Sequence, residues 1–272
     1  MTKIVFFGTS SFAVPALRAL ASDPRFSIVE VITQPDRPVG RHAEMTETPV
    51  KQAAKELGLP VFTELSEAAF DAAVVASYGV IIKQHILDLA PHRFLNIHAS
   101  LLPKYRGASP IREAIKNGDA ETGVTIMEMD AGMDHGPILS IHKEPILKDD
   151  DTPTLTERLA ALGAAVIGDV LAGVLDGSIQ PVPQDESEAT YVKLLKREDG
   201  KIDLDSMSPE QIERLIRANR PWPGTYIEKN GKRLKILDAH LEDGKLVFDM
   251  VQPEGKTAQT WAAFLRGNRD WN

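Results

Sequence analysis

The sequence contains no cysteine among its 272 residues. Disulfide bonds, thiolate metal sites and a covalent thioester intermediate are therefore excluded, and a nucleophile for any reaction would come from the substrate. We expect no signal peptide, because the apolar stretch Ile4–Phe7 is too short to serve as one. No apolar run approaches the length that spans a membrane. A cytoplasmic protein is expected.

An excess of positive charge is missing as well, since the formal net charge is −8. This is the wrong sign for a protein that holds nucleic acid mainly by neutralising phosphates. The acidic excess lies in residues 1–204, whereas the segment Asp205–Asn272 is near neutral. If the protein binds a polyanion, it has few cations to offer to phosphates.

The glycine fingerprint of dinucleotide-binding enzymes is also absent. Gly8-Thr9-Ser10 lies between the first apolar stretch and a helical pattern, where that fingerprint would stand, but only one of its three glycines is present. An NAD- or FAD-dependent enzyme is therefore disfavoured, and we interpret the segment as a tight turn from strand to helix.

What the first half does contain is an alternation of short apolar runs with segments of helical spacing. This alternation indicates an α/β fold with a mostly parallel, Rossmann-like sheet. The expected strands are Ile4–Phe7, Ile28–Ile32, Val61–Phe62, Ala72–Ala76, Phe94–His98, Val124–Met129 and Ile138–Ile141. The expected helices are Phe12–Ala21, Pro49–Leu57, Gln84–Ala90 and Thr154–Leu175.

The pattern changes in the second half, which predicts a separate and smaller unit. We divide the chain into a main domain at residues 1–177, a proline- and charge-containing linker at 178–204 and a small C-terminal domain at 205–272. The elements expected in this last part are a helix at Pro209–Ala218, hairpin turns at Asn230-Gly231 and Asp243-Gly244, and a final helix around Thr257–Leu265.

Polar residues of interest stand in the segment from Phe94 to Gly107. Side chains on a strand alternate between faces, so Asn96 and His98 share one face. They lie at the carboxyl end of an expected strand, where open α/β sheets place their ligand crevices. By spacing alone, hydrogen-bonded turn residues explain the pair about as well as a functional site does.

Asp134 shifts this balance, because it lies in the loop Met129–Gly136, whose glycines let the backbone fold back toward a neighbouring strand end. Asp130 in the same loop is the competing candidate. We interpret Asp130 as a turn residue at the end of the strand. The histidines other than His98 have no comparable partners in the sequence, and we assign them surface or loop positions.

These residues resemble a known family, the formyltransferases that use 10-formyltetrahydrofolate. Asn96-Ile97-His98 with Asp134, and the run Ser100-Leu101-Leu102-Pro103, are highly specific to folate-dependent formyl transfer. The runs Gln34–Arg41 and Thr48–Lys51 are similar to those of members that act on methionyl-tRNA. The resemblance extends along most of the chain.

The resemblance implies an enzyme of protein biosynthesis that transfers a formyl group from 10-formyltetrahydrofolate to the α-amine of initiator methionyl-tRNA. It implies a formyltransferase domain followed by a reduced, β-barrel-like (OB-like) domain, with folate as co-substrate and no metal. In such an enzyme Asn96 or a protonated His98 stabilises charge on the formyl oxygen, and Asp134 receives the proton of the amine. A monomer without a membrane partner is expected. The implied folate-binding wall consists of Ser100, Leu101, Leu102 and Pro103.

Two features differ from the family pattern. After Arg41 the loop carries acidic residues, including Glu44 and Glu47, where the family usually carries lysines. The C-terminal unit is short, because Leu246–Val251 leads directly into the final helix without the further strands of the family's barrel. RNA phosphates would then meet few cations. The candidates are Arg37 and Arg41 near the acceptor end, and Lys229, Lys232, Arg233 and Lys235 on the first hairpin.

Other functions remain open beside this one. A sugar-nucleotide N-formyltransferase would use the same folate donor, the same trio and a similar run from Leu101 to Gly107. A hydrolase that releases formate would use water in place of the amine. A binding module that keeps the fold without turnover is disfavoured, because Asn96, His98 and Asp134 are all present.

Overall fold

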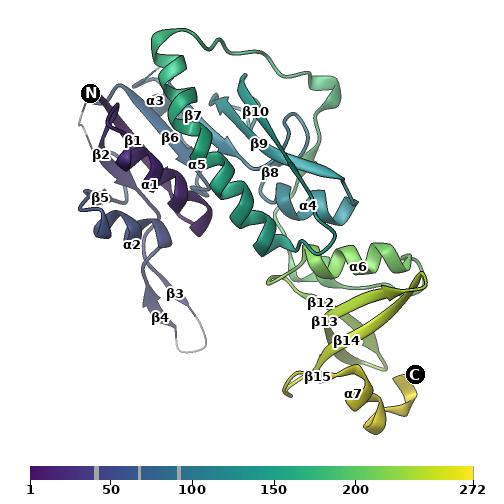
Figure 1. Ribbon diagram of the computed structural model, residues 1–272. Coiled ribbons are helices and arrows are strands. Elements are labelled where there is room, and N and C mark those ends of the chain that lie inside the picture. Colours follow the sequence, from purple (N-terminus) through teal and green to yellow (C-terminus); the bar gives the residue numbers. More distant parts are fainter. Residues whose placement is uncertain (40–42, 67–68, 91–92, 272) are drawn as a thin grey trace. The chain divides into compact units, whose positions relative to one another are not determined.

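The computed structural model describes residues 1–39, 43–66, 69–90 and 93–271. The chain forms two compact units that interleave in sequence (Figure 1). Unit 1 comprises Met1–Gly107, Thr122–Glu144 and Thr156–Tyr191, and unit 2 comprises Ala108–Glu121, Pro145–Leu155 and Val192–Asn272.

Within the described residues, unit 1 is built on a seven-stranded sheet with the order β10-β9-β7-β6-β1-β2-β5. The five strands from β5 to β7 in this order run parallel, and β9 is antiparallel to β7. The mostly parallel sheet that the sequence predicted is therefore confirmed. The strands are β1 (Thr2–Gly8), β2 (Phe26–Ile32), β5 (Val61–Phe62), β6 (Ala72–Ala76), β7 (Phe94–His98), β9 (Glu121–Glu128) and β10 (Ile138–Pro145).

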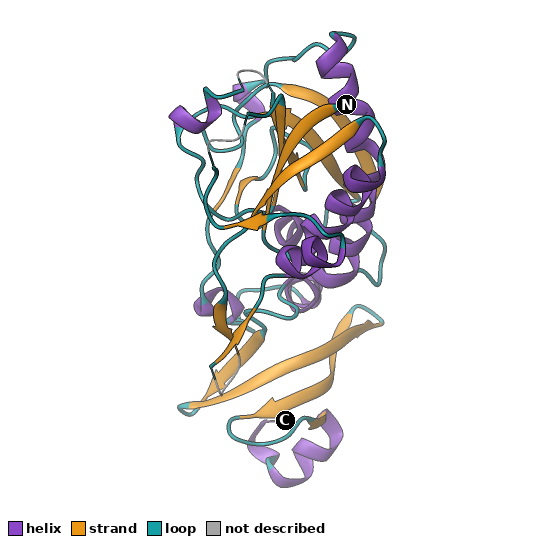
Figure 2. Cartoon of the chain, turned by 90° about the vertical axis from the view of Figure 1, so that its left-hand side faces the viewer, coloured by secondary structure: helices purple, strands orange, loops and turns teal. Residues whose placement is uncertain are grey.

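Helices lie beside this sheet, as the colouring by secondary structure in Figure 2 shows. The hydroxyl of Thr48 caps α2 by accepting the N–H of Lys51 at 3.1 Å, and Gly177, with φ of +79°, follows the end of α5. Helix α3 is shorter than predicted. The helices are α1 (Val14–Ser22), preceded by a 3₁₀ turn (Ser11–Ala13), α2 (Pro49–Glu56), α3 (Gln84–Leu87) and α5 (Thr152–Asp176).

Helix α5 packs directly on β7, and this contact decides which way the strand's side chains face. A Cβ at Gly163 would lie only 2.8 Å from Cγ2 of Ile97. Ile97 therefore points toward α5, and by alternation Leu95 does too. Asn96 and His98 point to the opposite face of the sheet, away from this helix.

The same helix corrects one expectation. We expected no apolar run of membrane-spanning length, but α5 is long and apolar enough to cross a membrane by length and composition alone. The buried core helix of a soluble protein passes the same test. Leu159, Ile167 and Leu171 of α5 are fully buried within the protein, so its apolar residues serve at least partly as core.

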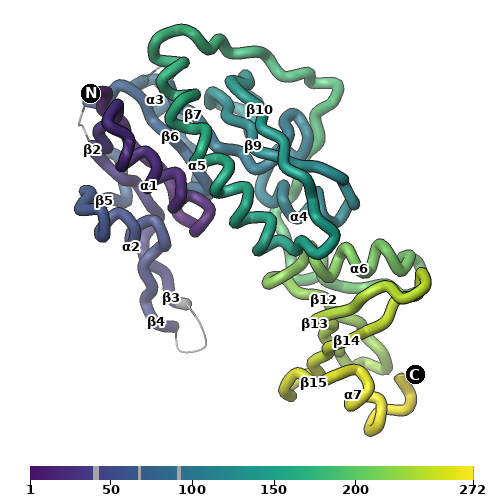
Figure 3. The backbone as a smooth tube through the Cα atoms, viewed as in Figure 1, coloured from purple at the N-terminus to yellow at the C-terminus, as the bar shows by residue number. Residues whose placement is uncertain are grey.

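Short pairs of strands complete unit 1. In Figure 1, β3 (Arg37–Val39) and β4 (Glu44–Thr46) form an antiparallel pair that extends from the region of α2. After α5 the chain runs past β10, where Val182 pairs with Ile138, and the tube in Figure 3 shows this path. Farther along, β8 (Arg106–Gly107) pairs with β11 (Tyr191–Val192). The 3₁₀ turn Glu186–Glu188 precedes β11 in unit 1, and the 3₁₀ turn Arg197–Gly200 follows it in unit 2.

Unit 2 contains a four-stranded antiparallel sheet in the described residues, in the order β12-β13-β14-β15. Both predicted hairpin turns are confirmed, since Asn230 and Asp243 have φ of +52° and +48° and each precedes a glycine of positive φ. The strands are β12 (Thr225–Lys229), β13 (Lys232–Glu242), β14 (Lys245–Pro253) and β15 (Gln259–Thr260). The helices are α4 (Pro110–Asn117), α6 (Pro209–Ala218) and α7 (Trp261–Gly267), with a closing 3₁₀ turn (Arg269–Trp271).

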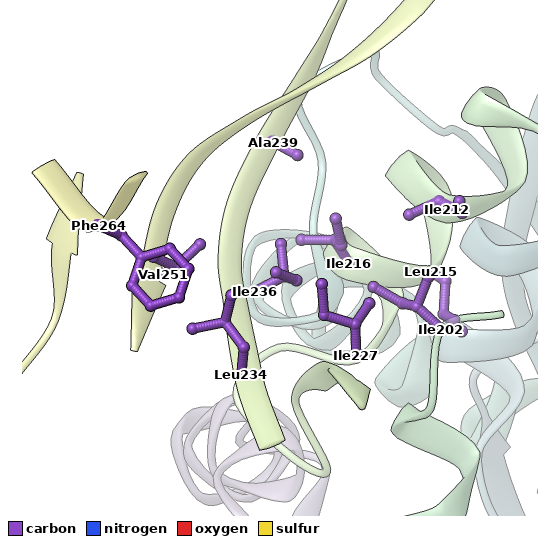
Figure 4. Packing of buried hydrophobic residues seen from close by; sticks show 10 residues of the cluster. All are labelled: Ile202, Ile212, Leu215, Ile216, Ile227, Leu234, Ile236, Ala239, Val251 and Phe264. Atoms are coloured by element: carbon purple, nitrogen blue, oxygen red, sulfur yellow. The ribbon is translucent and has the colours of Figure 1, made fainter. Parts of the chain in front are cut away.

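One hydrophobic cluster joins the sheet of unit 2 to its helices. Ile212 and Leu215 from α6 meet the inward side chains of β12, β13 and β14, and Phe264 from α7 joins them (Figure 4). Ile236 lies in this cluster on β13 and is 1% exposed. The neighbouring Lys235 points to solvent.

We predict that Ile236→Ala lowers the free energy of unfolding of unit 2 by about 2–5 kcal/mol, because it leaves a cavity in this cluster. Lys235→Ala on the same strand removes no buried atoms and should cost less than about 0.5 kcal/mol. Urea unfolding followed by tryptophan fluorescence checks both, since Trp261 and Trp271 pack against the cluster. Equal losses for the two variants would contradict the cluster as drawn.

Candidate active site

Three polar side chains of unit 1 meet at the carboxyl end of β7. The Asn96 Nδ2 donates to Oδ1 of Asp134 at 3.3 Å. The same oxygen lies 3.5 Å from Nδ1 of His98. The structure thus brings together the trio that the sequence singled out, with Asp134 arriving from the loop between β9 and β10.

The backbone conformation of this loop explains how Asp134 reaches the strand. Asp134 has φ of +49°, in the left-handed region that aspartate tolerates better than most residues. Its second oxygen, Oδ2, accepts the N–H of Gly107 at 2.8 Å. At Gly136 a Cβ would lie 1.9 Å from the carbonyl oxygen of Glu128, so only glycine allows the loop to close here.

The imidazole of His98 has a defined orientation. His98 is 6% exposed, and its Nε2 lies 3.1 Å from the carbonyl oxygen of Tyr105. A carbonyl only accepts, so this contact places a hydrogen on Nε2. In the neutral ring the lone pair of Nδ1 then faces Asp134, and a proton taken up on Nδ1 would lie between the ring and the carboxylate.

Asp130 has the role of a turn residue. Its Oδ1 accepts the N–H of Gly132 at 2.8 Å, and its Oδ2 lies 2.6 Å from Nδ1 of His135. His135 is half exposed, as is His240, whose pKa is raised by a hydrogen bond with Asp249. His42 and His92 lie outside the described residues.

The run from Ser100 to Pro103, the expected folate wall, is fixed by one buried threonine. Thr125 on β9 donates its hydroxyl to the carbonyl of Ser100 at 2.7 Å and accepts the N–H of Leu102 at 3.1 Å. Ser100 and Leu102 are buried, and Leu101 and Pro103 are half-buried. The wall is therefore held against the sheet next to His98, which pairs with Thr125 in register.

Two residues that the sequence analysis gave no role contact the site. The Gln184 Nε2 donates to the carbonyl oxygens of Asp134 at 2.9 Å and of Gly136 at 2.7 Å. Its Oε1 accepts from Nε and Nη2 of Arg106 at 3.1 and 2.8 Å. Arg106 stands in the run from Leu101 to Gly107, whose resemblance to other formyltransferases could have pointed to it. No sequence motif points to Gln184, because its partners lie far away in sequence.

Arg106 is a fully buried cation that is paired. Its Nη2 and Nη1 donate to the two oxygens of Glu186 at 2.6 and 3.0 Å, and Nη1 also reaches the hydroxyl of Tyr191 at 2.9 Å. These contacts raise the pKa of Arg106, and the hydrogen bond with Arg106 lowers the pKa of Glu186. The pair is therefore ionised at neutral pH.

The runs Gln34–Arg41 and Thr48–Lys51, which resemble those of enzymes acting on methionyl-tRNA, contact each other through one ion pair. The ammonium of Lys51 pairs with Asp36 at 2.7 Å, and this hydrogen bond raises the pKa of Lys51. These two side chains line a cavity of about 420 Å³ at the carboxyl ends of β2 and β5. Arg37 is exposed, although its guanidinium contacts Gln34. Arg41 lies outside the described residues.

The hairpin of β12 and β13 carries the other expected RNA contacts. Arg233 pairs with Glu228 at 3.0 Å and stacks on the ring of Tyr226 at 4.0 Å, so its charge is already engaged. Lys229 contacts the carbonyl of Asp270 and lies over the ring of Trp271. Lys232 and Lys235 are exposed, and neither forms an ion pair with another described residue.

As to metals, the part of the chain that the structure describes contains no group of three or more His, Cys, Asp or Glu side chains placed to hold an ion.

Comparison with known proteins bears on this geometry. The formyl transferase family matches residues 2–171, and its C-terminal domain matches residues 194–246. A methionyl-tRNA formyltransferase of Roseiflexus castenholzii is 43% identical, over 98% of this chain and 96% of its own length.

Solved structures at 20% identity share the fold. A sugar 3N-formyl transferase studied with dTDP and 5-N-formyl-THF aligns with a TM-score of 0.71, over 94% of this chain and 99% of its own. A methionyl-tRNA formyltransferase from Clostridium thermocellum aligns with a TM-score of 0.62, over 93% and 99%. Given the relative that is 43% identical over nearly both full lengths, the chain belongs to the methionyl-tRNA formyltransferase family.

Proposed function

We propose that this enzyme transfers the formyl group of 10-formyltetrahydrofolate to the α-amine of initiator methionyl-tRNA, as a monomer in the cytoplasm. The observation that carries the proposal is the meeting of Asn96, His98 and Asp134 within 3.5 Å, in a chain whose relatives act on methionyl-tRNA. The charged, hydrogen-bonding site suits a reaction in which a proton and a negative charge both move.

The chemistry assigns a task to each side chain. When the amine attacks the formyl carbon, negative charge develops on the formyl oxygen, and donors aimed at that position stabilise it. The amide nitrogen of Asn96 carries two hydrogens, and its contact with Asp134 uses one of them. The other hydrogen is available for the formyl oxygen. Both ring nitrogens of His98 already face acceptors, Nε2 the carbonyl of Tyr105 and Nδ1 the carboxylate of Asp134, so His98 acts on the site through Asp134.

Asp134 is placed to carry the proton that the reaction moves from the amine to the folate. The amine loses a proton as the new C–N bond forms, and the folate nitrogen must gain one as the old C–N bond breaks. A carboxylate beside an imidazole accepts that proton and returns it, directly or through water. Nδ1 of His98 lies 3.5 Å from Oδ1 of Asp134, close enough for a charged imidazole to stabilise the carboxylate electrostatically.

A second acceptor, an amino-sugar nucleotide, is suggested by the TM-score of 0.71 with a sugar formyl transferase. At 20% identity that likeness concerns the fold alone. One assay separates the two: purified protein and 10-formyltetrahydrofolate are incubated with methionyl-tRNA in one tube and an amino-sugar nucleotide in another. Formylation of the sugar alone would overturn the proposal.

Removal of any member of the trio should cut kcat for methionyl-tRNA on the order of 10²-fold, because each acts on the transition state. We expect this for Asn96→Ala, His98→Ala and Asp134→Ala, with a smaller effect on folate binding. Asp134→Asn should behave like Asp134→Ala. Asp130→Asn is the matched control and should keep near wild-type turnover; the opposite ranking would show that the acid has been misassigned.

The three side chains should also act as one unit. We predict that the double variant Asn96→Ala with Asp134→Ala loses much less than the product of the single losses, since the pair shares one transition state. Steady-state kinetics of the single and double variants measures this. Fully multiplicative losses would mean that the residues work independently.

The RNA contacts should be few. With two of the hairpin cations already engaged, we expect about three to five charges to meet phosphates, so the logarithmic salt slope of tRNA binding should be roughly −2 to −4. Arg41→Ala should raise the KM for tRNA strongly and leave folate binding unchanged. Filter binding across salt concentrations measures the slope, and a value steeper than about −6 would count against this account.

Charge reversal on the hairpin tests its part in RNA binding. Lys232→Glu with Lys235→Glu should weaken tRNA binding and flatten the salt slope by roughly two, because two phosphate contacts are lost. The control, Lys245→Glu with Lys256→Glu, changes the net charge equally at other exposed positions of unit 2. Identical KM and slope for the two double variants would remove the hairpin from the binding surface.

A further inference from the structure

The loop that carries Asp134 is held from outside the trio by one side chain of the segment after α5. Gln184 donates both hydrogens of its amide, one to the carbonyl of Asp134 at 2.9 Å and one to that of Gly136 at 2.7 Å. The sequence predicted a surface linker here. Most residues around Gln184 are exposed, but Gln184 itself is half-buried, with its amide against the backbone that presents the carboxylate.

The direction of the Gln184 amide is fixed by its other neighbour. Its oxygen accepts from Nε and Nη2 of Arg106, which has donors only. If the amide were reversed, its NH₂ group would face the guanidinium and its oxygen would face two carbonyls. Both contacts would be repulsive, so Arg106 forces the donating end of Gln184 toward Asp134.

Arg106 also lies between the two residues whose backbones touch the trio. The carbonyl of Tyr105 contacts His98, and the N–H of Gly107 contacts Asp134. Tyr105 has φ of +62°, a conformation unusual for a bulky residue, and its N–H is held by Oγ1 of Thr190 at 2.8 Å. One buried guanidinium therefore connects both loops that border the site.

We propose that Gln184 is a positioning residue: its amide, oriented by Arg106, holds the Asp134 loop where the carboxylate reaches both Asn96 and His98. That this position matters for turnover rests on the function proposed above. The position itself is a property of the folded chain and is measured separately.

The variant Gln184→Glu tests the position most sharply. The new carboxylate still accepts from Arg106, so the ion pair between Arg106 and Glu186 is kept. Its other oxygen faces the carbonyls of Asp134 and Gly136, and this repulsion should push the Asp134 loop away. The amide of Gly107 reports the outcome, because its N–H bonds to Asp134. We expect its hydrogen exchange, followed by NMR, to quicken about tenfold or more while the amides of β1 stay unchanged.

A matched control is available on the same segment. Gln180 is exposed, and its Nε2 donates to the carbonyl of Gly177 at 2.8 Å, so Gln180→Glu makes the same chemical change without touching the loop. It should leave the exchange of Gly107 unchanged. Unchanged exchange in Gln184→Glu as well would overturn the proposal. If Gln184→Glu does not fold, Arg106→Lys, which keeps the charge but loses the fork, should give the same change more weakly.

Kinetics then tests whether the position matters. In Gln184→Glu we expect kcat to fall on the order of 10- to 100-fold while the KM for folate changes less than about threefold. Combined with Asp134→Asn, Gln184→Glu should add little further loss, because its effect passes through that carboxylate. Full additivity, or a change in KM alone, would refute the positioning role.

The two proposals can fail separately. If the wild type formylates no amine, the proposed function fails, and the hydrogen exchange of the Gly107 amide still decides whether Gln184 positions the loop.

Discussion

A single backbone-to-carboxylate hydrogen bond, from the N–H of Gly107 to Oδ2 of Asp134, joins the two loops that border the end of β7. Because one carboxylate oxygen is anchored there, the other is left facing Asn96 and His98. The strand supplies two of the three side chains on a rigid sheet. The third depends on a loop, and this bond gives the loop a fixed end.

Such an arrangement carries strain, and the surrounding contacts offset it. Asp134 and Tyr105 both hold left-handed backbone conformations, which cost on the order of 1–3 kcal/mol each in a non-glycine residue. Close by, the buried guanidinium of Arg106 has its donors met by Gln184, Glu186 and Tyr191. A buried cation is tolerated only when it is satisfied in this way. The segment after α5 thus stabilises two strained turns through one residue.

The sequence was informative where periodicity governs the structure. Alternation predicted that Asn96 and His98 share a face, and the packing of Gly163 on Ile97 agrees with it. The glycines of its loop favoured Asp134 over Asp130, and the resemblance to known formyltransferases then implied its place in the trio. Gln184 could not be found in this way, because its contacts cross at least 48 residues and follow no period. The antiparallel direction of β9 was equally invisible, since a buried strand has the same pattern in either direction.

The interleaving of the two units has a consequence for how the protein is made. The segment Ala108–Glu121, with α4, belongs to unit 2, although it is synthesised between strands of unit 1. Its buried Arg112 donates to Asn219, which leaves the ribosome much later. Because domains tend to fold as they emerge, α4 cannot pack into unit 2 until α6 has been synthesised. No single cut yields two self-sufficient halves, and an arrested nascent chain would expose the apolar side of α4.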